Sequence, residues 1–439
     1  MLTFSSISNL IPPDSATIFI GYSGGVDSHV LLHLLANIPC LAPKIVALYV
    51  NHGLQDESDN WAIHCQQQCK QLDVAYKVLS VDAKAQAGES PEEVARNARY
   101  AAFRRLVKSG DILLTAQHRE DQLETVLLQM FRGAGLSGLS AMASYSAFGD
   151  GALIRPFLAI SKARIQAYAI HHHLSWIDDP SNLVDDFDRN YLRNQIIPLL
   201  KQRWPSLDHT VSRSAQHCAD GASLINDWVI LNMRQIVDPI DNGLIIPLWQ
   251  SFDAIQRSYL LRQWLTDFGL KPPSQAVLQT IMLQVIDATD SANPSVSLQN
   301  KRIKKYRQKL YCLDSSELVD TFNTGAWEPK QLFFDLANGY HLKLVDSTIG
   351  IPKSFWSSKA VTVQKRKGGE RIQLPFRQGS HCLKKLFQES NVPPWQRNSK
   401  PLIFIDGQLA VVPGLWVDQR FWADDDDCYQ IVMEKNNEF

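Results

Sequence analysis

The sequence lacks paired cysteine motifs, long apolar runs and an excess of either charge. Its 7 cysteines are odd in number and none is spaced Cys-x-x-Cys, which is typical of reduced thiols in a cytoplasmic protein. Cys65 and Cys69 have helical i, i+4 spacing, which favours thiols packed in a core. No signal peptide is evident before Ser15, and no apolar run approaches the ~20 residues needed to cross a bilayer. We therefore expect a soluble, cytoplasmic protein without a membrane partner.

Charge and composition set the class of protein but no function. The 44 Lys and Arg residues against 45 Asp and Glu residues give a net charge of -1, which argues against a protein that is basic throughout and coats nucleic acid. A local basic face stays compatible with this balance. Hydrophobic residues make up 45% and charged residues 20%, values that are ordinary for a globular protein.

The first half of the 439 residues alternates short apolar runs with helical patterns. This rhythm predicts an α/β domain with a parallel sheet. Ser90-Pro91-Glu92-Glu93 combines an N-cap, a first-turn proline and a capping-box acid, so a helix should begin there, run to about Lys108 and stop at Gly110. The runs that we expect to be strands are Ile18 to Tyr22, Ile45 to Val50, Val74 to Val81, Ile112 to Thr115 and Leu153 to Phe157.

Two further domains are expected behind the first, since a domain typically has roughly 100 to 200 residues. The alternation ends near Pro205, and apolar positions three and four apart predict helices from Thr210 to about Val285. Beyond a polar stretch near Ser315 to Glu328, strand-like runs such as 342–345, 402–405 and 408–412 predict a small β-rich or mixed domain, with turns at 368–369 and 406–407. The expected boundaries are 1–205, 206–316 and 317–439.

A glycine-rich loop carries the strongest chemical signal. It follows the first predicted strand and opens a helix, so its unpaired backbone N–H groups and the helix dipole can bind phosphate. Glycines let the backbone approach oxygen closely, serines add donors, and Asp27 is suited to hold a magnesium ion on departing pyrophosphate. The alternative is a tight turn with a serine N-cap. The predicted ATP-binding residues here are Ser23, Gly24, Gly25, Val26, Asp27 and Ser28.

This loop resembles that of the ATP pyrophosphatase, or PP-loop, superfamily, whose members adenylate an oxygen and release pyrophosphate. It lacks the lysine of the Gly-x-x-x-x-Gly-Lys-Ser/Thr loop, which disfavours transfer of the γ-phosphate. We therefore expect cleavage of ATP between its α and β phosphates.

Further segments converge on the same edge of the predicted sheet, where open α/β sheets bind ligands. Together with motifs near the C-terminus, they resemble the tRNA(Ile)-lysidine synthase family over nearly the whole chain. The segments that carry this resemblance are 51–54 (NHGL), 96–100 (RNARY), 115–125 (TAQHREDQLET), 133–139 (GAGLSGL), 179–182 (DPSN), 366–371 (RKGGER), 383–387 (LKKLF) and 393–395 (PPW).

The resemblance implies a ligase that uses ATP and Mg2+. ATP would adenylate the C2 carbonyl oxygen of the wobble cytidine, position 34, in tRNA(Ile) with a CAU anticodon. The ε-amine of free L-lysine would then displace AMP, which is a far better leaving group than a carbonyl oxygen. The product, lysidine, changes decoding from AUG to AUA. Domain 206–316 would recognise tRNA and domain 317–439 would bind it; a homodimer is compatible with the sequence, which leaves the oligomeric state open.

Four side chains are expected to be catalytic. Asp27 is one of them, and Asp121 and Glu124 share a face of a predicted helix, where they are suited to lysine's ammonium groups or to magnesium. The alternative for the two latter acids is a solvated helix start favoured by the dipole. His118 fits a phosphate contact or a proton relay, and equally a loop histidine that binds a backbone carbonyl. All three interpretations of His118 stay open.

Three basic residues are expected near the nucleotide. Arg96 and Arg99, three apart, suit the α-phosphate or the tRNA backbone, with a solvated helix face as the alternative. His52 lines the adenosine pocket or serves as a turn histidine. Arg189 and Arg193 belong to the family pattern, but their chemistry is obscure. No role is assigned to Arg119 and Glu120, which vary among relatives.

The basic segments 301–309 and 365–371 are candidates for phosphate contacts, although charge runs are usually solvated faces. Trp395 and Trp416 have apolar neighbours, which favours core packing over stacking on a base.

Three other functions are alternatives to the ligase. A tRNA thiolase would need paired reactive cysteines, and an amidotransferase would need a glutaminase nucleophile, neither of which the sequence shows. A nucleotide sensor would not need the acids and bases around the loop. Pyrophosphate release that depends on both tRNA and lysine separates the ligase from a sensor and from a thiolase.

Overall fold

The computed structural model describes residues 2–53, 57–84, 91–180, 184, 187–288, 294–315, 322–337 and 339–435. The chain forms two compact units, Met1–Asp227 and Trp228–Phe439, which are described separately. Among the described residues, no helix is both long and apolar enough to cross a membrane. Leu54, Ser90, Ser181 and Asn182, which belong to the sequence motifs above, lie outside the described residues.

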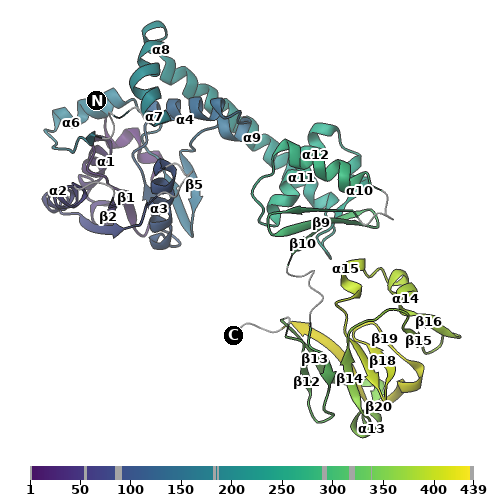
Figure 1. The fold of residues 1–439 in the computed structure, drawn as a ribbon. Coiled ribbons are helices and arrows are strands. Elements are labelled where there is room, and N and C mark those ends of the chain that lie inside the picture. The colour runs from purple at the N-terminus through teal and green to yellow at the C-terminus, as the bar shows by residue number, and fades with distance from the viewer. Residues whose placement is uncertain are drawn as a thin grey trace. The chain divides into compact units, whose positions relative to one another are not determined.

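The first unit is built on a six-stranded sheet in the order β3-β2-β1-β4-β6-β5 (Figure 1). Each of the five predicted runs overlaps a strand with a parallel neighbour, although β6 covers only the first two residues of the predicted run 153–157. The sheet also has an antiparallel edge strand, β5, that was not expected. A tight turn at Gly149, with φ of 59°, joins β5 to β6. The strands are β1 (Ile18–Gly21), β2 (Ile45–Asn51), β3 (Ala75–Ser80), β4 (Ile112–Leu114), β5 (Tyr145–Phe148) and β6 (Gly151–Ile154).

Alternating side chains of these strands pack into two separate apolar cores. Ile18 and Ile20 of β1 belong to a core shared with α1 and α6, whereas Phe19 packs into a core around Phe103 of α3. Because helices cover both faces, the central strands β1 and β4 are mainly apolar and buried, whereas the outer strand β3 is largely exposed. The helices are α1 (Val26–Ala36), α2 (Ser58–Gln71), α3 (Pro91–Leu106), α4 (Arg119–Phe131), α5 (Leu136–Leu139), α6 (Lys162–His171), α7 (Asp188–Tyr191) and α8 (Ile197–Arg203), with 3-10 turns at Phe4–Ser6, Ser8–Leu10 and Ala42–Lys44.

The sequence located α3 correctly, with Gly110 in the turn behind it at φ of 85°. Cys65 and Cys69 of α2 are buried in the apolar core, as their spacing indicated. One π-helical turn, Leu192–Ile196, links α7 to α8. Such turns often occur at functional sites.

The 30-residue helix α9 (Leu207–Ile236) begins in the first unit and continues into the second. The helices expected behind it are present, and the structure adds a four-stranded sheet, β7-β10-β9-β8, that the sequence did not predict. The basic segment 301–309 forms its central hairpin. The elements are α10 (Ile246–Gln250), α11 (Ala254–Asp267), α12 (Gln275–Ile281), a π-helical turn at Met282–Ile286, β7 (Leu244–Ile245), β8 (Ser295–Leu298), β9 (Lys301–Tyr306) and β10 (Lys309–Asp314).

The C-terminal part is rich in antiparallel strands, as expected. Two predicted runs are confirmed residue for residue as β17 and β18, joined by a turn at Asp406-Gly407. Trp416 packs on Phe387 in a small core, with ring centroids 5.2 Å apart. The elements are β11 (Gly325–Ala326), β12 (Phe333–Asp335), β13 (Tyr340–Pro352), α13 (Lys353–Ser358), β14 (Val361–Gln364), β15 (Arg371–Gln373), β16 (Ser380–Cys382), α14 (Leu383–Glu389), α15 (Pro394–Arg397), β17 (Leu402–Ile405), β18 (Gln408–Val412), β19 (Trp416–Val417), a 3-10 turn at Gln419–Phe421 and β20 (Ala423–Lys435).

Candidate active site

The glycine-rich loop connects the carboxyl end of β1 to the amino end of α1, as the sequence predicted. Its two serines face one another, with the hydroxyl oxygens 3.2 Å apart, and the Ser28 hydroxyl donates to the carbonyl of Gly25 at 3.0 Å. Gly25 caps α1, so the N–H groups of the following first turn have no partner within the helix. The loop therefore presents backbone donors and the positive end of a helix dipole in the way that a phosphate group requires.

Gly24 is required by the shape of the loop. Its φ is 82°, and a Cβ atom would lie 2.6 Å from Cδ1 of Ile177 and 2.9 Å from Sγ of Cys65. The backbone N–H of Ile177 also donates to the Gly24 carbonyl at 2.9 Å. The segment behind α6 thus supports the loop from its far side, in a role that the sequence did not reveal.

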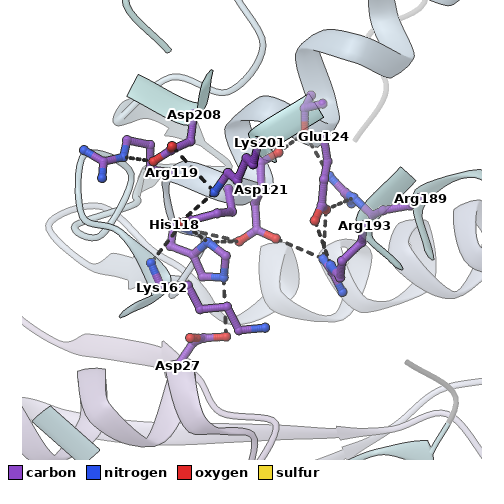
Figure 2. A network of polar contacts seen from close by, with 12 residues as sticks. Asp27, His118, Arg119, Asp121, Glu124, Lys162, Arg189, Arg193, Lys201 and Asp208 are labelled. Atoms are coloured by element: carbon purple, nitrogen blue, oxygen red, sulfur yellow. Dashed lines mark hydrogen bonds and ion pairs between the residues drawn. The ribbon is translucent and has the colours of Figure 1, made fainter. Parts of the chain in front are cut away.

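Asp27 in the first turn of α1 meets His118 at the start of α4 (Figure 2). The Nε2 atom of His118 lies 3.7 Å from Oδ2 of Asp27. The two residues follow β1 and β4, which are hydrogen-bonded parallel neighbours. Their contact therefore lies at the edge where open α/β sheets bind ligands.

His118 is 3% exposed and lies among carboxylates. Its Nδ1 atom is 3.3 Å from Oε2 of Glu120 and 3.5 Å from Oδ2 of Asp121. Burial alone would lower the pKa of His118, but the carboxylates of Glu120, Asp121 and Asp27 outweigh burial and raise the pKa above its ordinary value. The imidazole is therefore suited to carry a proton or a positive charge beside a phosphate.

Asp121 and Glu124 share one face of α4, as their spacing predicted, and both contact Arg193. Glu124 is 1% exposed; its Oε1 accepts from Nε of Arg193 at 2.7 Å, and its Oε2 accepts from Nε of Arg189 at 3.1 Å. Oδ1 of Asp121 lies 3.3 Å from Nη2 of Arg193, and its Oδ2 accepts from the backbone N–H of His118 at 2.9 Å. Glu124 is thus committed to two guanidinium groups, which compensate its buried charge.

A second group of charges fixes the first turn of α4 from the outside. Oε2 of Glu120 accepts from the backbone N–H of Lys162 at 2.9 Å, and Arg119 pairs with Asp208 at 2.7 Å. Lys201 Nζ lies 3.7 Å from Glu120 and 3.5 Å from Asp208. Burial would raise the pKa of Glu120, but His118 and the N–H of Lys162 lower it to about 2. Glu120 therefore remains ionised as an anchor for the helix.

The remaining predicted residues lie in two places. His52, just after β2, accepts from Nε of Arg99 at 3.3 Å, and burial together with this guanidinium lowers the pKa of His52 to about 4. The guanidinium of Arg96 lies 5.1 Å from the Tyr100 ring centroid. Arg96 also lines a cavity of about 500 Å³ together with Pro91, Glu93, Asn97, Thr125, Leu128, Gln129, Arg132, Met142, Phe187, Asp188 and Arg189.

One buried carboxylate oxygen in the site has no partner among the residues that the structure describes. This atom is Oδ1 of Asp27, which accepts no hydrogen bond from any of them. Burial raises the pKa of Asp27, and the nearby His118 and Lys162 do not fully offset this effect. A divalent cation bound to this oxygen would supply the missing positive charge, and oxygen is the ligand that magnesium prefers. The residues present therefore fit a magnesium ion held by Asp27.

The sequence located the loop, Asp27, His118, Asp121 and Glu124, and the structure brings these together. The sequence alone did not show which charged residues contact them. These are Glu120, Lys162, Arg189, Arg193, Lys201 and Asp208. One signal was available: Arg189 and Arg193 are four residues apart, so they share a helix face that can match the spacing of Asp121 and Glu124.

The chain is similar to known proteins over nearly its whole length. Family models described as PP-loop domain, TilS substrate binding domain and TilS substrate C-terminal domain match residues 3–200, 244–311 and 361–433. The tRNA(Ile)-lysidine synthase of Methylococcus capsulatus is 38% identical over 410 residues, 92% of this chain and 93% of the relative. Enzymes of the same name from Coxiella burnetii (37% identical, 92% of this chain and 90% of the relative) and Pectobacterium atrosepticum (37%, 96% and 95%) are also similar. By its loop, its site and these relatives, the chain belongs to the tRNA(Ile)-lysidine synthase family.

Proposed function

We propose that this chain ligates L-lysine to C2 of the wobble cytidine of tRNA(Ile) with a CAU anticodon, consuming ATP and releasing AMP and pyrophosphate. The observation that carries the proposal is the Asp27–His118 contact beside a phosphate-binding loop, in a chain that resembles lysidine synthases over 92% of its length. The adenylating site and the family's substrate domains are thereby found in one chain.

In the first step, the C2 carbonyl oxygen of cytidine attacks the α-phosphorus of ATP, and the bond to the β-phosphate oxygen breaks. Backbone N–H groups of 24–27 and the hydroxyls of Ser23 and Ser28 bind the leaving pyrophosphate. Magnesium at Asp27 would supply positive charge to the phosphates. His118 and Arg193, both close to Asp121, add positive charge where negative charge develops.

In the second step, a neutral ε-amine of lysine attacks C2, the bond between C2 and the AMP oxygen breaks, and the amine loses a proton. The proton is assigned to the released phosphate oxygen of AMP, because His118 already carries a proton in the first step. Lysine needs a site with both signs of charge, because it is a zwitterion with a second ammonium group.

The cavity beside α3 and α4 has this character, so we assign it to lysine. It offers the acids Glu93 and Asp188 and the bases Arg96, Arg132 and Arg189. Arg189 also bonds to Glu124 and to the Thr125 hydroxyl, at 3.1 and 2.8 Å, so the cavity borders the catalytic cluster. Asp121 and Glu124 then orient Arg193 and Arg189, while the cavity's own acids bind the ammonium groups.

The test uses the full chain with an unmodified tRNA(Ile) transcript, ATP, Mg2+ and L-lysine, followed by mass analysis of the nucleosides. A lysine adduct on the wobble cytidine is expected, and its absence despite ATP turnover, or incorporation of sulfur instead, would contradict the proposal. Asp27→Asn should lower the rate by at least about 100-fold without weakening tRNA binding, since a transition-state contact is lost. Asp14→Asn, at an exposed position of the same unit, is the matched control and should retain full activity.

A further inference from the structure

A basic loop in the second unit has the features of a built anion site. It joins β14 to β15 and carries Lys365, Arg366 and Lys367 in succession. These three residues, with Gly368 and Asn398, line a cavity of about 320 Å³. Lys365 and Lys367 also line a neighbouring cavity of about 390 Å³ at the edge of β11 and β14. The two cavities therefore share two lining lysines, Lys365 and Lys367.

The positive charges of Lys365 and Lys367 are not compensated locally. Within the part of the chain that the structure describes, no carboxylate forms an ion pair with either lysine. Other lysines of this unit are paired, for example Lys359 with Asp406 at 2.8 Å and Lys353 with Asp346 at 2.9 Å. The uncompensated pair thus generates a local positive potential that attracts an anion.

Two of the three cations, Lys365 and Arg366, are also held in position by aromatic rings. Lys365 Nζ lies 5.5 Å from the ring centroid of Phe322, and the guanidinium of Arg366 lies 5.5 Å from that of Phe387. Phe387 is fully buried and Phe322 is 7% exposed, so both rings are fixed parts of the core. Cations that are already ordered lose less side-chain entropy when they bind a ligand.

A single acid shapes this loop from within. Oε1 of Glu370 accepts the backbone N–H of Gly368 at 2.7 Å and that of Lys367, while its Oε2 lies 3.4 Å from Nε of Arg366. The side chain of Glu370 is 11% exposed, so its charge faces the loop rather than solvent. Gly368 and Gly369 have φ of 93° and 82°, which lets the chain turn tightly around the carboxylate. Glu370 therefore fixes the backbone of Lys367 and Gly368 and lies beside the guanidinium of Arg366.

We propose that the loop 365–368, held in shape by Glu370, binds a backbone phosphate of the RNA substrate. The inference rests on the proposed function for the identity of that RNA. Lysine ammonium groups and a guanidinium match phosphate oxygens and not base edges, so the site adds affinity and position without reading sequence. The two adjoining cavities suit a phosphodiester chain that passes over the shared lysines better than an isolated phosphate ion.

Substitution of Glu370 provides the sharpest test. An effect of net charge alone and a positioning role of Glu370 predict opposite changes in the Kd for RNA. Removing a carboxylate from a basic loop should tighten RNA binding if only net charge matters. If Glu370 positions the cations, Glu370→Ala should instead raise the Kd of the full chain for tRNA about fivefold. Glu370→Gln keeps an oxygen for the two N–H groups but turns an amide donor toward Arg366, so it should raise the Kd by a smaller factor.

Removal of the cations gives an independent measurement. Lys365→Gln/Lys367→Gln should raise the Kd about tenfold. The slope of log Kd against log salt should fall by about 1 to 2, because the variant contacts fewer phosphates and therefore releases fewer counterions when it binds RNA. The matched control Lys359→Gln removes a lysine that Asp406 already neutralises, and should leave Kd and slope within twofold. Circular dichroism and thermal unfolding confirm that each variant is folded.

Several outcomes would overturn the inference. In the first, Glu370→Ala binds tRNA as tightly as the parent protein or more tightly. In the second, the double lysine variant has the same Kd and salt dependence as Lys359→Gln. A difference between parent and double variant that vanishes when millimolar inorganic phosphate is added would assign the loop to free phosphate. Lysidine formation by the parent protein is measured separately. A failure of the proposed function and a failure of the RNA-binding proposal for the loop therefore give different results.

Discussion

Arg119 Nε lies 2.7 Å from Oδ2 of Asp208, so the first turn of α4 is joined to the first turn of α9 (Figure 2). Asp208 is 6% exposed, and Lys201 bridges it to Glu120. The neighbouring residue on α4 is His118, which contacts Asp27. The ion pair therefore fixes the first turn of α4, directly behind His118, for which we propose a catalytic role.

We predict that Asp208→Asn lowers kcat for lysidine formation about tenfold, because a small displacement of a catalytic group can cost up to ~100-fold in rate. The KM for ATP should stay within twofold, since the phosphate-binding loop lies on another helix. Steady-state kinetics of pyrophosphate release with saturating tRNA and lysine measure both constants.

A double-mutant cycle separates positioning from stability. Arg119→Ala and Asp208→Asn should each lower kcat, and the combined variant should be no worse than either one, because both remove the same contact. Arg119→Lys should restore part of the rate. Additive losses in kcat, or losses that only follow the fraction of folded protein, would contradict a positioning role.

Gly24 supports a second prediction, about the loop itself. Gly24→Ala places a methyl group 2.6 Å from Ile177 Cδ1 at a φ of 82°, so the loop must move away from its phosphate-binding shape. We expect the KM for ATP to rise at least about tenfold, measured at saturating tRNA and lysine.

A second variant separates the two causes of the higher KM for ATP, the clash with Ile177 and the positive φ of residue 24. Gly24→Ala/Ile177→Ala removes the steric clash but not the unfavourable φ, so it should recover only part of the affinity for ATP. Full recovery would show that sterics alone govern the loop. An unchanged KM in Gly24→Ala would show that the loop shape is not required.

Much of this architecture follows from local sequence rules. The loop, α3, β17 and β18 were predictable because turn residues, caps and apolar periodicity specify them within about ten residues of chain. The contact between Asp27 and His118 was also foreseeable in outline, because both follow strands that end at the same edge of a sheet.

The features that were missed depend on tertiary contacts. β5 is a short edge strand whose residues are partly exposed, so it lacks a continuous apolar run. β9 in the second sheet is a basic, partly exposed segment. Its sequence resembles a solvated charged surface and gives little sign of a strand. Besides the contact of Glu120 with the nearby His118, Arg119 and Glu120 gain their roles through Asp208, Lys201 and the backbone of Lys162, to which no local pattern points.

Buried histidine chemistry in the first unit gives the final prediction. His29 of α1 is 2% exposed, and its Nδ1 forms a 2.7 Å hydrogen bond with the hydroxyl of Tyr22. Burial, with smaller contributions from the charges of His33 and His64, lowers the pKa of His29 from 6.5 to about 4. The folded protein thus binds this proton less readily than the unfolded chain does.

The stability that His29 contributes as a neutral group is therefore fully present above about pH 6.5 and is lost as the pH falls towards about 4. Between about pH 7 and pH 4.5, the free energy of unfolding of the parent protein should fall by ~2 kcal/mol more than that of His29→Gln. Urea unfolding at each pH measures this difference, and His217→Gln, at an exposed position of α9, controls for the loss of a histidine. Equal pH dependence of the parent and His29→Gln would show that His29 titrates alike in the folded and unfolded chain, which its burial against Tyr22 forbids.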